Sequence, residues 1–446
     1  MTDTAISPML DISSYRSLGS ARNRRVTVIP ETTSNVTGST STQETYFSIP
    51  SSKYSMINGQ GSYLYFDYAI TGSSTLASET LSPINLGPKN GSAQSFIKTV
   101  ETMVQSQSCE YLDNYNVFSA IMDDFQAKGR SANVGSILQG SINPDCTTAR
   151  TTANSATFLN TFQAIKQPFP HTNAQVYRAC IPIYSAVLGV LAETYVPAGD
   201  GIRLRIVWDT ILKSCFGATA TAYTLSNIRL QMDYIDIEPA VWMNLVAEGK
   251  GVLKSHATAI ANYETSVALA DRTQSILIPA RFSSVKFLMS CWRNSATPTS
   301  LLNSVGSRLF PNLDQFCVNI GGKNYPSTNI SAKLSDGTYT GAETFMEVCR
   351  IFSQIHSPQF DIVFDVNEYL GTTTLPSMNS FVLGLCFEEY SGANKLVSGI
   401  DTNSTNLYLQ TTHSADLATA CVVDSFVGYD LIIELDSATN SMSFSK

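Results

Sequence analysis

Short segments in which apolar and polar residues alternate recur along most of the chain. Residues 202–208 read IRLRIVW, and residues 228–237 read IRLQMDYIDI. A period of two places every second side chain on the same face, which predicts half-buried β-strands. Similar apolar runs predict strands over residues 63–70, 96–104, 274–279, 285–289, 316–320, 360–366, 381–387, 406–410 and 429–435. Because turn residues separate these short strands, the pattern predicts a β-sandwich or β-barrel protein.

Helical periodicity is scarce. Residues 109–126 place Leu112, Tyr115, Phe118 and Met122 at helical spacing, and residues 342–353 (AETFMEVCRIFS) are a second candidate. Each candidate helix lies at a comparable depth within a strand-rich block. The two blocks therefore share a plan of strands, one helix and more strands, although no residue-level repeat accompanies that plan.

The length of 446 residues fits two domains of about 200 residues each. Pro239 marks the end of the first strand-rich block, and the following thirty or so residues have weak periodicity. We predict an N-terminal arm at 1–43, a first strand-rich domain at 44–239, a connector at 240–270 and a second domain at 271–446.

The predicted arm contains a low-complexity stretch at 34–43 (SNVTGSTSTQ), which cannot build a core. It also contains a basic cluster of Arg16, Arg22, Arg24 and Arg25, with no acidic residue between Asp11 and Glu31. Two interpretations stay open for this cluster. It contacts nucleic acid or another anionic surface, or it belongs to a solvated or intersubunit segment.

Charged residues make up only 14% of the chain, against about 25% in typical soluble domains. Uncharged polar groups cost less to bury than charges do, so this composition suits broad subunit contacts. The net charge of −8 argues against a dedicated nucleic-acid-binding domain. We find no apolar signal-peptide core at the start and no run near the roughly 20 apolar residues of a membrane span, which predicts a cytosol-like compartment.

The residues that could carry chemistry are scattered. The four histidines, His171, His256, His356 and His413, are isolated in the sequence, and the nine cysteines form no CxxC pair. We interpret the cysteines as buried free thiols and predict no metal site and no cofactor. The nearest approaches to paired carboxylates are Asp123–Asp124, Glu388–Glu389 and the group Asp233, Asp236 and Glu238. We interpret these carboxylates as solvated surface residues, and since no nucleophile or phosphate-loop motif is present, we predict that the protein is not an enzyme.

Several motifs follow one another in an order that resembles a known family. The most specific run is residues 179–189 (ACIPIYSAVLG), followed by 193–197 (ETYVP) and the strand at 202–208. Residues 110–116 (EYLDNYN) and 223–239 continue the match in the first half, and 303–326, 398–402 and 428–430 give a looser match in the second half. In this order the chain resembles the double jelly-roll major capsid proteins of Polinton-like viruses, adintoviruses and virophage-type elements, which are related in fold to adenovirus hexon.

The resemblance implies an all-β fold of two consecutive jelly-roll barrels, with short inserted helices and an extended N-terminal arm. It implies a viral major capsid protein that forms homotrimers with a pseudo-hexagonal outline and assembles an icosahedral shell inside the host cell, without secretion. The partners it implies are the chain itself, neighbouring capsomers, and penton and minor capsid proteins. Contact of the arm with the genome or an internal membrane, and binding to a host receptor, stay open. The alternatives are a single jelly-roll capsid protein with a protruding domain and a non-viral carbohydrate-binding β-sandwich protein.

Overall fold

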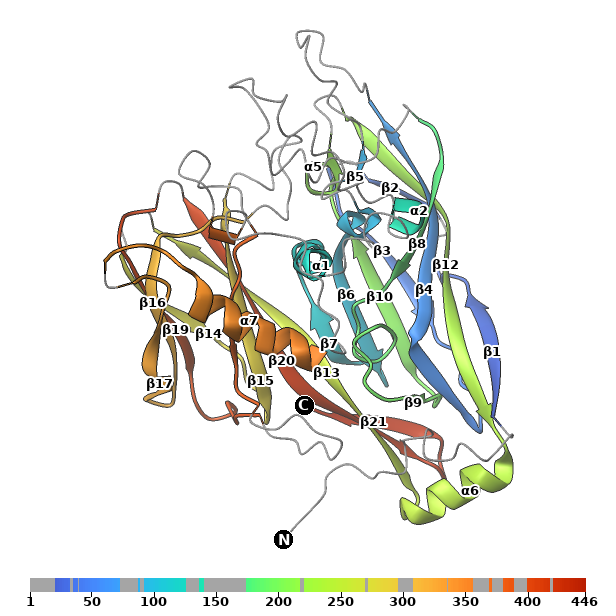
Figure 1. The fold of residues 1–446 in the computed structure, drawn as a ribbon. Helices are drawn as coiled ribbons and strands as arrows, with labels where there is room; N and C mark the ends of the chain where they lie inside the picture. The colour runs from blue at the N-terminus through green and yellow to red at the C-terminus, as the bar shows by residue number, and fades with distance from the viewer. Residues whose placement is uncertain are drawn as a thin grey trace.

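The alternating segments of the sequence form two β-sandwiches that stand side by side in the computed structural model (Figure 1). The structure describes residues 21–32, 35–38, 40–72, 87–88, 92–125, 136–139, 174–216, 220–268, 272–295, 308–334, 336–355, 369–370, 380–388, 399–417 and 420–446. The strand predicted at 360–366 lies outside these residues. No helix within the described ranges is both long enough and apolar enough to cross a membrane.

The first sandwich consists of two antiparallel sheets. One sheet runs in the order β1 (Ala21–Val28), β12 (Ala222–Ile237), β4 (Ser55–Thr71) and β8 (Tyr177–Pro182), with β2 (Val36–Gly38) beside β12 and β9 (Val196–Pro197) beside β4. The other runs β3 (Gln43–Ser48), β10 (Ile202–Trp208), β6 (Ile97–Val104) and β7 (Gln107–Leu112). Alternation sets the faces of β10, because Leu204 and Ile206 are buried whereas Arg205 points outward to Glu44 and Glu101.

The second sandwich repeats this arrangement. Its first sheet runs β13 (Val252–Val267), β20 (Cys421–Asp436), β15 (Val285–Asn294) and β18 (Leu383–Cys386), with β21 (Ser441–Ser445) paired to β20. Its second sheet runs β14 (Thr273–Ile278), β19 (Leu407–His413), β16 (Leu313–Ile320) and β17 (Lys323–Ser331).

Helices interrupt the strands at matching places. Helix α1 (Tyr115–Asp124) follows β7, and α7 (Ala342–Ile355) follows β17. The helix predicted in each half is confirmed, but residues 109–112 belong to β7, and Asn114 turns the chain into α1 with a left-handed φ of 48°. The smaller elements are β5 (Gly87–Pro88), η4 (Ala93–Phe96), α2 (Ser136–Gln139), α5 (Ile211–Ser214), β11 (Cys215–Phe216) and α6 (Pro239–Glu248). The shared strand order makes each sandwich a jelly roll, so the predicted fold class is confirmed.

Each roll has its own aromatic core between its two sheets. In the first roll, Phe66 of β4 packs edge-on against Trp208 of β10, with ring centroids 5.5 Å apart. In the second roll, Trp292 of β15 lies 6.2 Å from Phe381. All four side chains are essentially inaccessible to solvent. Burial of rings of this size supplies much of the apolar contact in each roll.

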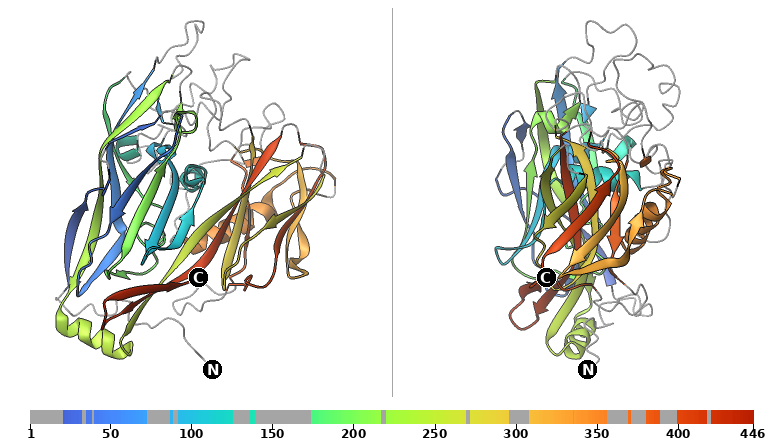
Figure 2. Two further views of the ribbon diagram at one scale, coloured as in Figure 1. Left: turned by 180° about the vertical axis from the view of Figure 1, so that it is seen from behind. Right: turned by 90° about the vertical axis from the view of Figure 1, so that its left-hand side faces the viewer.

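Two of the segment predictions are wrong in part. The connector expected over 240–270 contains α6 and then β13, which pairs with β20 along all sixteen of its residues. The arm expected over 1–43 contains β1, whose eight residues pair with β12, and also β2 and the start of β3. Both errors arose in strands with weak apolar alternation. Each roll therefore begins with a strand that lies before the predicted boundary. Figure 2 shows the two rolls from behind, with β1 in dark blue at the outer edge of the first roll.

Candidate functional site: a polar junction between the two rolls

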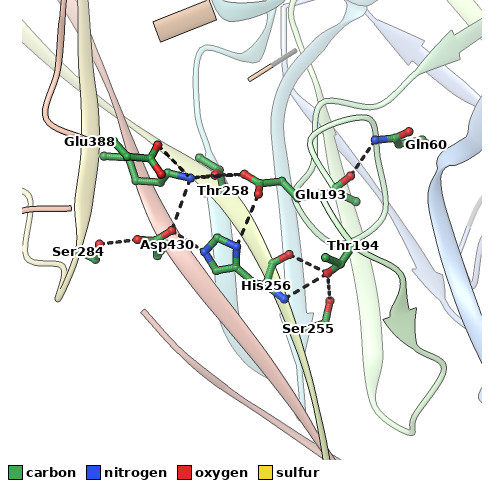
Figure 3. Close-up of polar contacts among 11 residues, drawn as sticks. Gln60, Glu193, Thr194, Ser255, His256, Thr258, Ser284, Glu388 and Asp430 are labelled. Atoms are coloured by element: carbon green, nitrogen blue, oxygen red, sulfur yellow. Dashed lines mark hydrogen bonds and ion pairs between the residues drawn. The ribbon is translucent and has the colours of Figure 1, made fainter. Parts of the chain in front are cut away.

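The two rolls meet across a cluster of buried polar and charged side chains, which we call the polar junction. The first roll contributes Glu193 and Thr194, from the segment between β8 and β9 (Figure 3). The second roll contributes residues of β13, β15 and β20, one residue just before β15 and one just after β18: Ser255, His256, Thr258, Lys286, Asp430, Ser284 and Glu388. Because β20 is central in its sheet, the junction lies over the middle of that sheet.

Lys286 lies at the centre of the polar junction. Its side chain is only 4% exposed, and its ammonium lies 3.4 Å from Glu193, 3.6 Å from Glu388 and 3.7 Å from Asp430. It also donates a hydrogen bond of 2.9 Å to the Thr258 hydroxyl. Burial by itself lowers the pKa of Lys286, but the surrounding carboxylates outweigh this effect and raise the pKa. Lys286 is therefore held as a cation that one carboxylate of the first roll and two of the second share.

His256 is the second basic residue of the junction. Its Nε2 lies 2.5 Å from Asp430, and its Nδ1 lies 3.6 Å from Glu193. Burial disfavours the imidazolium and lowers the pKa of His256, yet the hydrogen bonds to Asp430 and Glu193 prevail and raise it. Three carboxylates face Lys286 and His256, so protonation of His256 brings the cluster closer to neutrality.

Hydroxyl groups fix the positions of the junction's charged residues. Thr258 donates to Glu193 over 2.6 Å, and the Ser284 hydroxyl donates to Asp430. The hydroxyl of Thr194 accepts from the backbone nitrogen of His256 at 3.2 Å and donates to its carbonyl at 2.9 Å. The backbone of β13 is thereby tied directly to the first roll.

The loop that carries Glu193 is itself held by a buried carboxyl group. Glu110 of β7 accepts hydrogen bonds from the Ser185 hydroxyl at 2.6 Å and from the backbone nitrogen of Ala186 at 2.7 Å. Burial raises the pKa of Glu110 to about 7, although these hydrogen bonds act in the opposite direction. Gly189 completes the loop, because a Cβ there would lie 1.9 Å from the carbonyl oxygen of Ile183. Two of the motifs that carry the family resemblance, 110–116 and 179–189, are thus in contact.

A second set of contacts joins α1 of the first roll to the second roll. The side-chain nitrogen of Asn114 donates to Asp424 at 2.8 Å and to Glu264 at 2.7 Å, and Asp424 also accepts from Arg293 at 2.5 Å. The ring of Phe118 lies 5.3 Å from that of Phe426. At the end of the helix, Arg308 pairs with Asp124, and the rings of Phe125 and Phe352 stack at 3.8 Å.

The predicted arm residues lie away from this junction. Arg22, Arg24 and Arg25 are on β1, at the edge of the first roll, and Arg16 lies outside the described residues. Arg24 pairs with Asp236 at 2.9 Å and covers the ring of Tyr234 at 5.1 Å. Arg22 and Arg25 are exposed. Their role stays a prediction.

Several residues that we interpreted as solvated are buried instead. Asp124 pairs with Arg308, Asp233 accepts from Asn58 at 3.0 Å, and Glu388 lies beside Lys286. Each partner is remote in sequence, so local spacing carried no sign of the pairing. Glu389 lies outside the described residues, while Asp236 is partly exposed in its pair with Arg24.

The polar junction is suited to fixing the two rolls against each other. Among the residues that the structure describes, no group of three or more His, Cys, Asp or Glu could hold a metal ion. Eight of the cysteines that we interpreted as free thiols form no disulfide among the described residues, and Cys146 lies outside those residues. His413 is buried and hydrogen-bonded to the carbonyl oxygen of Pro311 at 2.8 Å, whereas His171 and His356 are not described. The charges of the polar junction are paired with one another.

Comparisons with known proteins bear on the fold. No family model and no curated protein matches the chain by sequence. Among solved structures, the chain is similar to the Faustovirus major capsid protein, with a TM-score of 0.60 and 9% identity over 93% of this chain and 90% of that chain. A chain in the structure of the Sputnik virophage gives 0.56 and 11%, over 96% of this chain and 89% of that one. A chain of the PBCV-1 virus capsid gives 0.54 and 9%, over 96% and 97%. At these identities the likeness establishes the double jelly-roll fold.

Proposed function

We propose that this chain is the major capsid protein of a DNA virus and that it acts as a structural subunit. The observation that carries this proposal is the pair of jelly rolls with the same strand order, fixed beside each other by the polar junction. The similarity in fold to capsid proteins of Faustovirus and PBCV-1 supports it. The alternative of one jelly roll with a protruding domain does not fit, because both halves of the chain are jelly rolls.

In this proposal three copies form a homotrimer. Two rolls per chain give a trimer six barrels, and six similar barrels around one axis produce a pseudo-hexagonal outline that can tile an icosahedral facet. A buried, fully paired charge cluster suits this role, because its many directional contacts fix one orientation of the rolls. Neighbouring capsomers, penton proteins and minor capsid proteins are the further partners, and the virion, assembled inside the host cell, is the place of action.

Electron microscopy of the purified chain tests the proposal directly. We expect pseudo-hexagonal capsomers, alone or joined in closed shells. Single rod-like or ellipsoidal particles of one chain, at micromolar protein and after incubation at several ionic strengths, would contradict a capsid role.

The N-terminal residues before β1 are proposed to act as a tether to neighbouring capsomers, or to contact the genome or an internal membrane. A truncation that starts at Ala21 keeps β1 and its pairing with β12, whereas removal of 1–43 would also delete β1. We expect the truncated chain to form capsomers but to close shells poorly. Normal shells from this truncation would eliminate the tether.

A further inference from the structure

The polar junction places an amine of one roll against a carboxyl group of the other, in a place with little access to water. Lys286 Nζ lies 3.4 Å from Oε1 of Glu193, the shortest of its three distances to carboxylates. The side chain of Lys286 is 4% exposed and that of Glu193 is 13% exposed. Two reactive groups fixed in contact have a very high effective concentration, and exclusion of water slows hydrolysis of their product.

A hydroxyl group connects the amine to the carboxyl group. The Thr258 hydroxyl accepts a hydrogen bond of 2.9 Å from Lys286 Nζ and donates one of 2.6 Å to Oε1 of Glu193 (Figure 3). This is the geometry of a proton relay, because the hydroxyl can take a proton from the nitrogen while it gives its own to the oxygen. One such transfer turns the ion pair into a neutral amine beside a neutral carboxylic acid, which are the forms that can react.

The other carboxyl oxygen of Glu193 faces the imidazole of His256. Nδ1 of His256 lies 3.6 Å from Oε2 of Glu193, and Nε2 lies 2.5 Å from Asp430, which orients the ring. The pKa of His256 is raised, so its imidazolium form persists to a higher pH than in a free histidine. A cation at this place stabilises the negative charge that develops on Oε2 when a nucleophile adds to the carboxyl carbon.

We propose that Lys286 and Glu193 condense to an amide, which links the two rolls covalently within one folded chain. Nζ attacks the carboxyl carbon Cδ, so that the Cδ–Nζ bond forms and the Cδ–Oε1 bond breaks. Two protons pass from Nζ through the Thr258 hydroxyl to Oε1, which leaves as water. One ammonium and one carboxylate thus give one amide and one water molecule, and the reaction uses no other reagent. The ion pair that the structure contains is the state that precedes this reaction.

Burial of the pair favours the amide. Two buried charges are costly to desolvate, and condensation removes one positive and one negative charge from the junction together. The bond closes a loop between residues that are 93 positions apart, and a cross-link of this span restricts the unfolded chain. Because the bond lies within one chain, it goes beyond the capsid role and holds or fails independently of it.

Mass spectrometry of the purified, folded chain detects the bond. After prolonged incubation at neutral pH, the intact chain should be lighter than its sequence by one water molecule, whereas Lys286→Arg, which has no nucleophilic amine, should have its full mass. Trypsin should release residues 179–203 joined to residues 282–293, because it does not cleave after an acylated lysine. A full mass for the unmodified chain, with a folded circular dichroism spectrum, would overturn the proposal. A branched peptide that joins Lys286 to Glu388 or Asp430 would overturn it as well.

Two substitutions of Thr258 separate the relay from the packing of its side chain. Thr258→Val keeps the shape but lacks the hydroxyl, and we expect it to slow the loss of water at least about a hundredfold, as removal of a proton-transfer group does. Thr258→Ser restores the hydroxyl and should restore the loss of water. Circular dichroism checks that both variants fold. Loss of water at an unchanged rate in Thr258→Val would overturn the proposed reaction.

Lys254 and Glu434 provide the matched control within the same chain. Their charged atoms lie 2.7 Å apart, closer than those of Lys286 and Glu193, but their side chains are 46% and 33% exposed. Water therefore solvates both charges and competes with the amine for the carboxyl carbon. The tryptic peptides should contain no branch between Lys254 and Glu434. A branch there as abundant as the one at Lys286 would show that contact alone suffices and would overturn the role given to the junction.

Discussion

Strands β1 and β13 hold the same place in their rolls, yet their surroundings are opposite. Each opens its roll and pairs with a sixteen-residue strand. Seven of the eight residues of β1 are exposed or half-buried, whereas residues 255–260 of β13 are all buried. The first roll covers β13, whereas no other part of the described chain covers β1 to the same extent.

The largest effect should follow from removing Lys286 of β15, the cation that donates a hydrogen bond to Thr258 of the covered strand β13. Lys286→Ala leaves Glu193, Glu388 and Asp430 facing each other without their shared ammonium. Loss of one partner from a buried charge cluster costs about 3–5 kcal/mol, because the remaining charges stay desolvated. Urea unfolding followed by fluorescence measures the change in the free energy of unfolding.

An exposed pair on the same sheet provides the control for that change. Lys254 on β13 lies 2.7 Å from Glu434, and both side chains are substantially exposed. Lys254→Ala should cost about 1 kcal/mol or less, as exposed ion pairs do. Equal losses for the two lysines would show that the polar junction is not a buried cluster of the kind described.

Two buried groups should make the stability of the fold depend on pH. The pKa values of His256 and Glu110 are raised on folding, the latter to about 7. The folded chain therefore binds more protons than the unfolded chain does. Each group contributes fully to the free energy of unfolding at a pH below its unfolded pKa, and this contribution is lost as the pH rises through its folded pKa. For Glu110 the contribution is lost between pH values of about 4.5 and about 7, and it amounts to about 3 kcal/mol of the free energy of unfolding at most.

Urea unfolding between pH 5 and pH 9 should thus show decreasing stability, and Glu110→Gln or His256→Gln should flatten the curve. His413 is the control, because burial lowers its pKa and its contribution has the opposite sign. A free energy of unfolding that rises with pH across this range would contradict the raised pKa values of His256 and Glu110. So would a pH dependence whose slope neither substitution changes.

The smallest effect should come from the open strand. Arg24 and Asp236 are about two-fifths and one-third exposed, respectively, so water screens their pairing. Arg24→Ala should change the free energy of unfolding by about 1 kcal/mol or less. A loss comparable with that of Lys286→Ala would remove the contrast between β1 and β13.

The sequence was sufficient to predict the strands that pack against an apolar core. β10 and β15 follow from alternation or apolar runs between turns, and α7 follows from its helical period. β13 escaped prediction because small and polar residues, such as Ala257, His256 and Thr258, occupy its buried positions. His256 and Thr258 face Glu193 of the other roll, so the strand lacks the usual apolar signature.

The polar junction could not be predicted for a related reason. Its members come from remote segments: Glu193 and Lys286 are 93 residues apart, and His256 and Asp430 are 174 apart. Isolated histidines and carboxylates in a sequence are most simply interpreted as solvated. Only the arrangement of the two rolls brings them together, and the buried polar face of β13 was the one local sign.

Multi-angle light scattering of the purified chain at micromolar concentration measures the mass of the assembled species and so decides whether the chain forms the proposed trimer. We expect a single species with three times the mass of one chain, because each chain supplies two of the six barrels of the capsomer. A stable species with the mass of one chain would contradict it.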